Sequence, residues 1–367
     1  MSNELLYQIA LSKIPNIGDV HSKTLINFFK EASAIFQAPR RILEKIEGIG
    51  KIRAQSIKSF KDFAICEREI NFIQKNNITP TFFTSESYPK RLLHCNDAPI
   101  LLFHKGNLNL QCEKIISIVG TRNHSSYGKN LCEKFVAELK EYGITIVSGL
   151  AHGIDTIAHE TALQHQLPTI AVLAHGLDRI YPYCNTSTAI EMCKQGGLLT
   201  EFASGTNPDK QNFPKRNRIT AGICDALIVI ETGKKGGSLI TAEIAHSYHK
   251  DIFTFPGRVT DTKSEGCNHL IKDQKAYLIS NANDFIEMMN WQKKQKKKTP
   301  IQTGLFNNLN ETESTIIHTL QQSEGSHILE IQQNCRLSSS LLSIHLLELE
   351  LKGLIQSLPG NRFCLVP

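Results

Sequence analysis

The 367-residue sequence lacks the signatures of secretion, of membrane insertion and of structural zinc. Its ten cysteines are scattered without any Cys-x-x-Cys pair, which argues against zinc ribbons and redox motifs. The first residues, MSNELLYQIALSKIPNIG, hold no basic segment and no small-residue cleavage site, and no apolar run approaches the ~20 residues that span a bilayer. We therefore expect a reduced, cytoplasmic protein with no membrane contact.

The sequence also has no large excess of either charge. A net charge of +6 and a pI near 8.7 permit a polyanionic partner without requiring one. The hydrophobic content of 41% is slightly low for a globular chain but does not indicate general disorder. The length exceeds that of one ordinary domain, so we expect two or three.

Residues 1–80 have helical patterns and contain a repeated apolar-x-x-apolar-Gly turn, IPNIG at 14–18 and IEGIG at 46–50. Each turn precedes an amphipathic helix and resembles a helix-hairpin-helix (SAM-like) element, whose glycines let backbone N–H groups approach a phosphate. A plain helical hairpin explains the same pattern without DNA. The residues of the second turn that we consider as a secondary DNA contact are Gly48, Gly50 and Lys51.

Residues 81–290 alternate apolar strands with amphipathic helices. Strand patterns such as IISIVG (115–120), ITIVSG (144–149) and ALIVIE (226–231) are separated by helical patterns. This order predicts an extended Rossmann-like α/β domain, with a doubly wound, mostly parallel sheet covered on both faces. Ligands of such sheets bind at the carboxyl ends of the strands.

The remaining chain begins with a Lys-rich linker, residues 291–300, which includes WQKKQKKK. Residues 301–367 then show three helical patterns and a hairpin-like end, the outline of a winged helix; a three-helix capping domain is the alternative. Its candidate recognition stretch, LSSSLLSIHLLELELKG, is rich in leucine and has Lys352 as its single cation. This composition favours a protein-interaction module, or a contact within the chain itself, over contact with a DNA groove.

Four strand ends of the 81–290 domain are rich in glycine, cations or hydroxyl groups. They are IVGTRNHSSYG, SGLAHGID, FPKRNR and GKKGGSLITAE, and they predict loops that bind several adjacent phosphates. The first is not GxGxxG, so a dinucleotide site is not supported. We expect Arg122, Lys215 and Arg218 to share one rim; Phe213 either stacks on a base or packs under its loop. The candidate nucleic-acid-binding residues are Gly120, Thr121, Arg122, Ser148, Gly149, Lys215, Arg216, Asn217, Arg218, Lys234, Lys235, Gly237 and Ser238.

The same segments, together with TIAVLAHGLDRIYP and FPGRVTDTKSEGCNHLI, resemble the DprA/Smf family (DNA processing protein A) over residues 88–279. The resemblance implies a homodimeric single-stranded DNA-binding protein that protects incoming strands in natural transformation and loads RecA recombinase on them, without catalysis. It extends to single residues. Gly120 and Arg122 match the family's Gly-x-Arg; Lys215, Asn217 and Arg218 match its FPxRNR segment; Ser238 lies in the matching GSLIT turn. The departures from the family pattern are Ala174, Cys224, Gly236 and Gln274.

An enzymatic interpretation competes with DNA binding. Rossmann-like nucleotide N-glycosidases (phosphoribohydrolases) carry a carboxylate at a spacing similar to Glu243, but their Pro-Gly-Gly-x-Gly-Thr turn is replaced here by Lys-Lys-Gly-Gly-Ser-Leu. His152, His159 and His165 are close in sequence, but a metal site needs a further ligand type. Asp155 follows Gly-Ile and is expected to be a helix N-cap instead of a general base. We therefore expect no catalysis, no cofactor and no metal.

Overall fold

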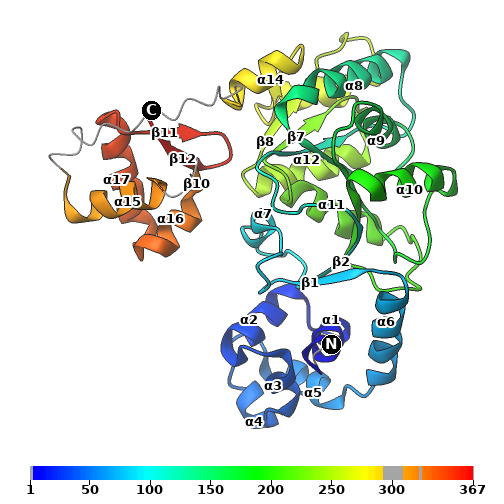
Figure 1. Cartoon of the computed structure of the whole chain (residues 1–367), viewed down its shortest axis with the longest axis vertical. Coiled ribbons are helices and arrows are strands. Elements are labelled where there is room, and N and C mark those ends of the chain that lie inside the picture. The colour runs from blue at the N-terminus through cyan, green and yellow to red at the C-terminus, as the bar shows by residue number, and fades with distance from the viewer. Residues whose placement is uncertain (1–2, 292–308, 322–324, 367) are drawn as a thin grey trace.

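The computed structural model describes residues 3–291, 309–321 and 325–366. Figure 1 shows an N-terminal group of helices, a central sheet flanked by helices, and a smaller C-terminal domain. The described helices include none that is long and apolar enough to cross a membrane. The N-terminal helices are α1 (Asn3–Lys13), α2 (Asp19–Phe29), α3 (Ala32–Gln37), α4 (Arg40–Leu43), α5 (Gly50–Ser59) and α6 (Phe63–Lys75).

The two glycine turns of the N-terminal domain lie next to each other. Gly48 and Gly50 have φ angles of 77° and 58°, which glycine adopts without strain, and α5 begins at Gly50. Arg53 donates to the carbonyl oxygens of Gly48 (2.9 Å) and Asn16 (3.0 Å), so it joins the second turn to the first. Arg53 therefore has a structural role in this hairpin.

The central sheet has nine strands in the order β1-β2-β6-β5-β4-β3-β7-β8-β9. All neighbours from β6 to β9 are parallel, whereas β1 and β2 add an antiparallel edge, so the predicted mostly parallel, doubly wound sheet is confirmed. The strands are β1 (Thr79–Phe82), β2 (Leu101–Gly106), β3 (Ile115–Val119), β4 (Thr145–Ser148), β5 (Thr169–Val172), β6 (Gly197–Thr200), β7 (Ala226–Val229), β8 (Asp251–Thr254) and β9 (Tyr277–Leu278).

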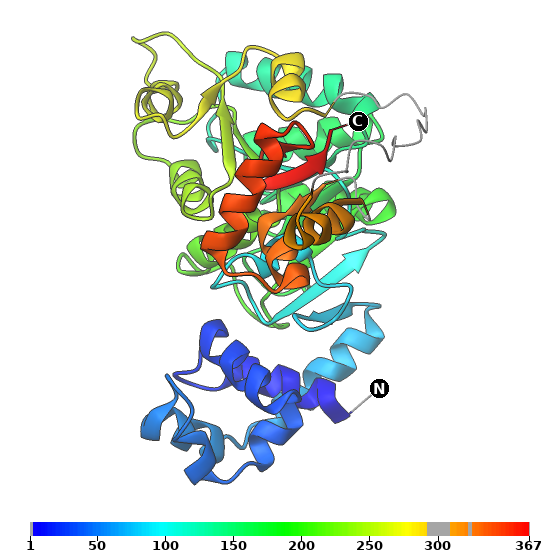
Figure 2. The ribbon, with the colours of Figure 1, turned by 90° about the vertical axis from the view of Figure 1, so that its left-hand side faces the viewer.

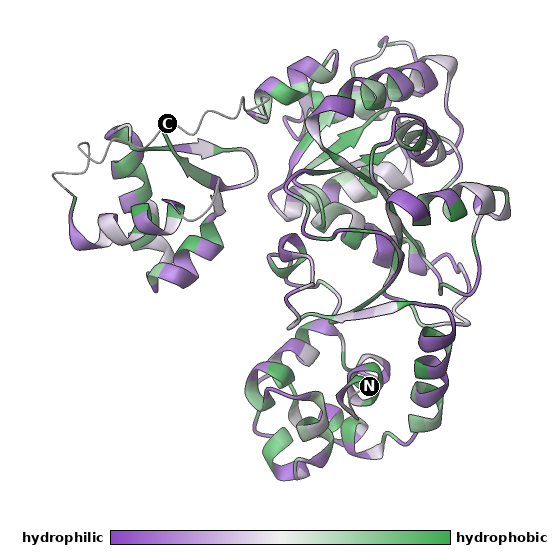
Figure 3. Ribbon diagram, in the orientation of Figure 1, coloured by the Kyte–Doolittle hydropathy of each residue, from purple (hydrophilic) through white to green (hydrophobic). Residues whose placement is uncertain are grey.

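Helices cover both faces of this sheet, and alternate residues of β3 show how. Ile116 and Ile118 pack in the same cluster as Phe135 of α8, whereas Ile115 lies in the cluster of Ile219 on the other face. Figure 3 shows the apolar strands in the interior. The helical segments of the core are α7 (Lys90–Leu93), α8 (Ser126–Glu138), η1 (Leu139–Tyr142), α9 (Ile154–Gln164), η2 (Tyr183–Asn185), α10 (Thr186–Gln195), α11 (Asn212–Gly222), α12 (Gly237–Ser247), α13 (Glu265–Lys272) and α14 (Ala282–Met288).

The order in which successive strands are added to the sheet reverses between the neighbouring parallel strands β3 and β7. The strands that follow β3 extend the sheet toward β6 on one side, and β7, β8 and β9 extend it on the other. The gap above β3 and β7 is therefore the topological switch point, where open α/β sheets usually bind their ligands.

Two segments differ from the sequence-based expectation. The segment with FPKRNR, expected as a loop, is helix α11; Pro214 is tolerated because it lies in the first turn, where its missing N–H has no intrahelical partner. Strand β1 begins at Thr79, and Phe82 and Phe103 belong to the same hydrophobic cluster as the N-terminal helices. The N-terminal helices thus pack directly on the edge of the sheet.

The C-terminal domain is a winged helix, as predicted. Its three-stranded sheet has the order β10-β12-β11 and the domain has its own hydrophobic cluster. The predicted linker, 291–300, lies outside the described residues except for Trp291, whose ring packs on Phe285. The elements are α15 (Glu311–Gln321), β10 (Ser326–His327), α16 (Ile328–Cys335), α17 (Ser339–Leu351), β11 (Ile355–Leu358) and β12 (Arg362–Leu365).

Candidate nucleic-acid interface

A small pocket lies above the carboxyl ends of β4 and β5. The guanidinium of Arg122, from the loop after β3, lies 5.2 Å from the centre of the Phe213 ring at the start of α11. The Tyr181 ring meets the Phe213 ring edge-on, with centroids 6.3 Å apart. The enclosed space measures about 20 Å³, room for one small polar group. The lining residues are Arg122, Gly149, Ala151, His152, Leu173, Ala174, His175, Tyr181, Pro182, Phe213 and Arg216.

Arg216 forms the base of this pocket and is 5% exposed. Its guanidinium lies against Gly149, where an added Cβ would come within 1.5 Å of Nη1, so a side chain at this position would displace the guanidinium. Asp155 is the nearby carboxylate; burial raises its pKa, and the positive charge of Arg216 opposes that rise. Asp155 accepts the backbone N–H groups of Gly149 (3.1 Å) and Ala151 (3.4 Å). It is therefore not the predicted N-cap, a position that Gly153 occupies, but the residue that shapes the loop beneath the pocket.

Two buried polar atoms at this pocket have no hydrogen-bond partner among the described residues, Nε of Arg216 and Nε2 of His175. The Nδ1 atom of His175 lies 2.9 Å from the carbonyl oxygen of Gly176, so it carries the proton and donates, which leaves Nε2 as an acceptor. Burial lowers the pKa of His175 and favours this neutral form. The Nε–H of Arg216 is thus a donor available in the pocket, whereas the His175 ring also lies against the backbone of Tyr181. Sequence reasoning missed His175, although its position three residues after the end of β5 was a usable signal.

The switch point between β3 and β7 is already occupied by a side chain of the protein. Glu231, directly after β7, is 1% exposed and accepts the backbone N–H of Ser125 (2.8 Å) and the Ser125 hydroxyl at the start of α8. Gly128 lies so close that an added Cβ would be 2.6 Å from the Glu231 carboxylate. Dinucleotide enzymes use this helix N-terminus for phosphate. Here a carboxylate satisfies it, which argues against nucleotide binding at this position.

The backbone of the Gly120–Thr121 turn is likewise engaged within the protein. An added Cβ at Gly120 would lie 2.6 Å from Ile154, and the N–H of Thr121 donates to the Glu231 carbonyl oxygen at 2.8 Å. The exposed side chains of this loop are those of Arg122 and its neighbour Asn123. Of the three residues predicted here, the structure therefore places one at the surface.

Lys215 and Arg218 lie on the opposite side of α11 from the pocket. Arg218 forms ion pairs with Glu201, at the end of β6, and with Asp19 of the N-terminal domain (3.2 Å). Asp19 also accepts the backbone N–H of Ile100 at 2.9 Å. Burial raises the pKa of Glu201 to about 7, against the opposing effect of Arg218. The expected shared rim is thus divided: Arg122 and Arg216 line the pocket, whereas Arg218 joins two domains.

A cleft of about 790 Å³ between the N-terminal domain and the core is lined by Lys215 and Arg218. Lys215 is exposed there and remains available to a solvent-borne ligand, and Asn217 is half-buried. The cleft and the pocket therefore lie on two sides of one helix.

The other predicted residues of the core lie at or near the same carboxyl edge. Lys234, Lys235 and Gly237 are exposed at the start of α12. The hydroxyl of Ser238 is buried and donates to Thr232 Oγ1 (2.8 Å), and that of Ser148 donates to the Ile118 carbonyl oxygen (2.6 Å). The two lysines thus add surface charge, and the two serines have structural contacts.

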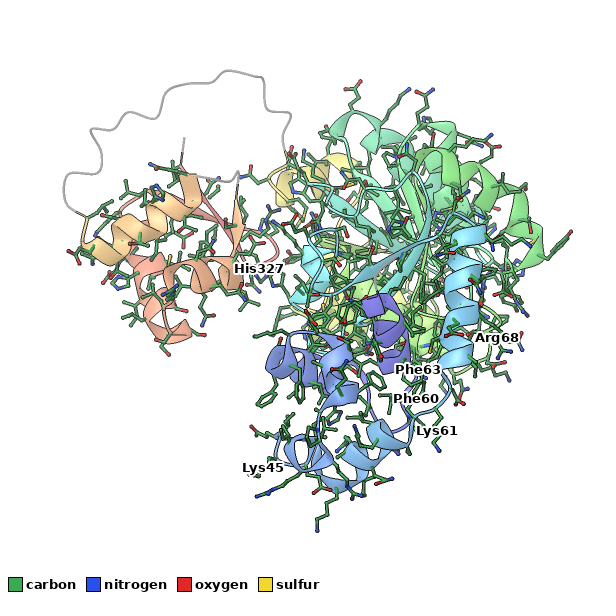
Figure 4. All side chains as sticks on the ribbon, turned by 60° about the horizontal axis from the view of Figure 1, so that its bottom comes forward. Lys45, Phe60, Lys61, Phe63, Arg68 and His327 are labelled. Carbon is green, nitrogen blue, oxygen red and sulfur yellow. The ribbon has the colours of Figure 1, made fainter. Side chains whose placement is uncertain are left out.

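The N-terminal turn has its own cations. Lys51 is exposed beside the Gly48 and Gly50 turn. Figure 4 shows Lys45, Lys61 and Arg68 directed outward from the same domain, with Phe60 and Phe63 inside. These cations lie at separate places on the N-terminal domain.

The residues weighed for catalysis or metal binding are not gathered into a site. Glu243 pairs at the surface with Lys275 at 2.7 Å. His159 is buried and bonded to the Thr169 hydroxyl at 2.7 Å, away from His152, whose ring faces Cys184. Within the described ranges, the group with metal-ligand spacing consists of Glu313, His345 and Glu348. The Lys352 ammonium already pairs with Glu313 in that group, at 2.5 Å.

The chain matches known proteins over most of its length. Residues 79–290 match the family described as DNA recombination-mediator protein A, and residues 308–361 match the DprA winged helix domain. DNA processing protein DprA of Streptococcus pneumoniae is 42% identical over 208 residues, 56% of this chain and 73% of that protein. Protein Smf of Escherichia coli is 37% identical over 241 residues, 65% of this chain and 64% of that protein.

Two solved structures are similar in fold and sequence. The X-ray structure of DprA from S. pneumoniae aligns with a TM-score of 0.66 and 33% identity over 78% of this chain and 98% of that chain. The DprA of Helicobacter pylori, whose structure is described in terms of its single-stranded DNA binding mode, aligns with a TM-score of 0.53 and 32% identity over 57% of this chain and 94% of that chain.

Proposed function

The chain belongs to the DNA recombination-mediator protein A family, and from this membership we propose that it binds single-stranded DNA and transfers it to RecA recombinase in natural transformation and recombination. The observation that carries the proposal is the pocket of Arg122, Phe213 and Arg216 at the carboxyl edge of the sheet. One cation there is exposed, a second is buried with an unpartnered N–H, and an aromatic ring lies against the first. This combination suits a phosphate next to an unstacked base.

In the proposed complex a strand follows the carboxyl edge of the sheet. Arg122 holds one phosphate with its planar fork, and Lys215, Lys234 and Lys235 supply further positive charge along the path. A single strand is flexible enough to direct one group into a recessed pocket, whereas a stiff duplex presents its phosphates on a convex surface. The protein should therefore prefer single strands and show little sequence preference.

The proposed role requires no catalysis. Two carboxylates at the carboxyl edge, Asp155 and Glu231, are both buried and both accept hydrogen bonds from the backbone. Glu243, the carboxylate of the glycosidase alternative, is held in a surface ion pair. We propose a DNA-binding mediator that acts in the cytoplasm without a cofactor.

We further propose that the protein acts as a homodimer through the free edge of the sheet. Strand β9 pairs with β8 on one side. Its residues Tyr277 and Leu278 are 53% and 47% exposed. An unpaired strand edge with apolar side chains is a ready surface for a second chain.

Binding of poly-dT and of blunt duplex of equal length, measured over a series of salt concentrations, tests the function. Log affinity for poly-dT should fall with log salt at a slope of about −0.7 per neutralised phosphate, and duplex should bind more weakly at every salt concentration. Lys134→Ala is the matched control, because Lys134 is an exposed cation (71%) on α8, outside the pocket. Equal or tighter duplex binding throughout the series contradicts the proposal.

A further inference from the structure

Two histidine rings stack where the winged-helix domain meets the core. His94 follows α7 of the core, and His327 directly precedes α16 of the winged helix. Their ring centroids are 4.0 Å apart and the ring planes differ by 16°. Figure 4 shows His327 on the side of its domain that faces the core, and Figures 1 and 2 show this domain beside the central sheet and apart from the N-terminal helices. The histidine pair, His94 and His327, thus joins two domains.

The wing of the domain, the turn between β11 and β12, makes a second contact with the core. An added Cβ at Gly360 of this turn would lie 3.9 Å from the carbonyl oxygen of Asp225, which directly precedes β7. Burial raises the pKa of Asp251, the first residue of β8, and a hydrogen bond from the Gly360 N–H opposes that rise. Asp225 and Asp251 lie at the amino ends of their strands. The winged helix is therefore docked at the amino edge of the sheet, opposite the edge that carries the pocket.

The hydrogen bonds of His327 require a neutral ring. Its Nδ1 atom accepts the backbone N–H of Leu329 at 3.2 Å and so caps the N-terminus of α16, and the Glu330 carboxylate accepts the backbone N–H of His327 (3.4 Å) in return. An imidazolium carries protons on both nitrogens and cannot accept this bond. Its positive charge would also face the positive end of the helix dipole. Protonation of His327 therefore disrupts the start of α16.

The charged groups around the histidine pair also disfavour protonation. Burial lowers the pKa of both rings, that of His327 to about 3, and nearby positive charges lower it further. Glu330 of α16 acts in the opposite direction on His94. Two positive rings at 4.0 Å would repel each other directly. The cations that face the pair are Arg91 of α7, Lys250 between α12 and β8, and Arg362 of β12, with Lys90 and Arg336 along the groove beside His94.

We propose that the histidine pair makes docking of the winged helix sensitive to pH: the domain is docked on the core when both rings are neutral and is released when either ring takes up a proton. In the released state each ring meets solvent and regains an ordinary pKa of about 6.5, so acid favours release. Docking is therefore stabilised above pH 6.5 and is lost progressively as the pH falls below it. Asp251 acts in the opposite sense, because its pKa is raised in the docked state.

His327 alone sets a minimum size for the effect. With a docked pKa of about 3 and a released pKa of about 6.5, the equilibrium constant for docking falls about tenfold between pH 7.5 and pH 5.5. His94 adds to this fall, because its pKa is also lowered in the docked state. A groove of about 570 Å³ lies between α7 and α16, so the two domains are loosely packed beside the rings. Contacts of this kind within a chain are readily reversible, and a tenfold change should shift much of the population.

Energy transfer within single full-length chains, labelled at the C-terminus and at the exposed position of Lys140 in the core, measures docking between pH 8 and pH 5.5. Transfer in the wild type should change as the pH falls below 6.5. His327→Asn keeps a side chain that caps helices but takes up no proton, and His94→Phe keeps an aromatic ring without a titrating group. Each variant should show a shallower pH dependence than the wild type. The double variant should show none.

His269→Gln is the matched control, since the His269 side chain is 64% exposed on α13 of the core, and it should titrate like the wild type. Asp251→Asn should keep or steepen the pH dependence, because it removes the group of opposite sign. Circular dichroism at each pH confirms that every variant is folded, and the two single variants are read independently. Transfer that stays constant in the wild type from pH 8 to pH 5.5 overturns the proposal, as does a pH dependence that the double variant retains in full.

Discussion

Replacing Arg122 or Arg218 by alanine should have different consequences, although both arginines belong to sequence motifs that predict phosphate binding. Arg122 is exposed and lies over Phe213, so a phosphate can reach its guanidinium. Arg218 is 13% exposed and its guanidinium is held by Glu201 and Asp19. Arg122→Ala should therefore weaken binding to single-stranded DNA, and Arg218→Ala should weaken the contact between the N-terminal domain and the core.

The size of each effect follows from these contacts. One phosphate contact on a single strand contributes about 0.7 to the slope of log affinity against log salt concentration. If variant and wild type bind equally at 1 M salt, loss of this contact lowers the affinity at 0.1 M salt about fivefold, roughly 1 kcal/mol. Arg218→Ala leaves Glu201 buried without its cation. Removing one member of a buried pair costs about 3–5 kcal/mol, and the low end applies here because Glu201, whose pKa is already raised to about 7, can take up a proton.

Fluorescence anisotropy with labelled poly-dT over a series of KCl concentrations, together with urea unfolding, measures both effects. Arg122→Ala should flatten the slope by about 0.7 and leave the unfolding midpoint nearly unchanged. Arg218→Ala should keep the slope and lower the midpoint. Arg122→Lys should recover only part of the affinity, because an ammonium cannot hold a phosphate bidentately. If the two alanine variants flatten the slope equally, the division of the cations on α11 is wrong.

Three further predictions concern other side chains of the site. Burial raises the pKa of Glu201 from 4.5 to about 7. Ionisation of this carboxyl therefore lowers the free energy of unfolding only above pH 4.5, by about 1.4 kcal/mol per pH unit. The loss reaches roughly 3 kcal/mol above pH 7. The free energy of unfolding of Glu201→Gln, relative to that of the wild type, should therefore increase between pH 5 and pH 8. A difference between the two proteins that stays constant with pH would contradict this. Phe213→Leu should lose about 1–3 kcal/mol of poly-dT affinity with little change in melting temperature, because the half-buried ring lines the pocket; retained affinity with a lowered melting temperature would assign Phe213 to packing. Neither the wild type nor Glu243→Gln should release free base from nucleoside monophosphates, and turnover that the substitution abolishes would revive the glycosidase interpretation.

The sheet was predictable from the sequence because its strands are buried on both faces. Such strands appear as short apolar runs between amphipathic helices, and that pattern fixes a parallel, doubly wound sheet. The sequence did not show that β1 and β2 extend the sheet as antiparallel strands, because short edge strands resemble connecting segments. It also did not show that the N-terminal helices share a hydrophobic cluster with Phe82 and Phe103. That contact joins segments far apart in the chain, and no local pattern reports it.

The division of the cations on α11 was not predicted from the sequence because one segment was expected to be a loop. With FPKRNR treated as a loop, its charged residues could all face one ligand. In a helix, residues three apart share a face and residues two apart point in nearly opposite directions. Phe213 and Arg216 therefore line the pocket together, and Lys215 and Arg218 line the cleft together. Recognising the proline as a first-turn residue would have separated the two pairs without any structure.

The position of the pocket also has a physical cause within the fold. The helix N-terminus at the switch point attracts anions, and Glu231 satisfies it from inside the protein through Ser125. A phosphate at that position would have to displace a buried carboxylate that is already hydrogen-bonded, and it would meet the negative charge of that carboxylate. Positive charge is instead found above the neighbouring strands, where Arg216 is buried beside Asp155 and Arg122 reaches over from the loop after β3. A ligand reaches this pocket from the carboxyl edge of the sheet, which suits a polymer that lies along that edge and directs one group into the pocket.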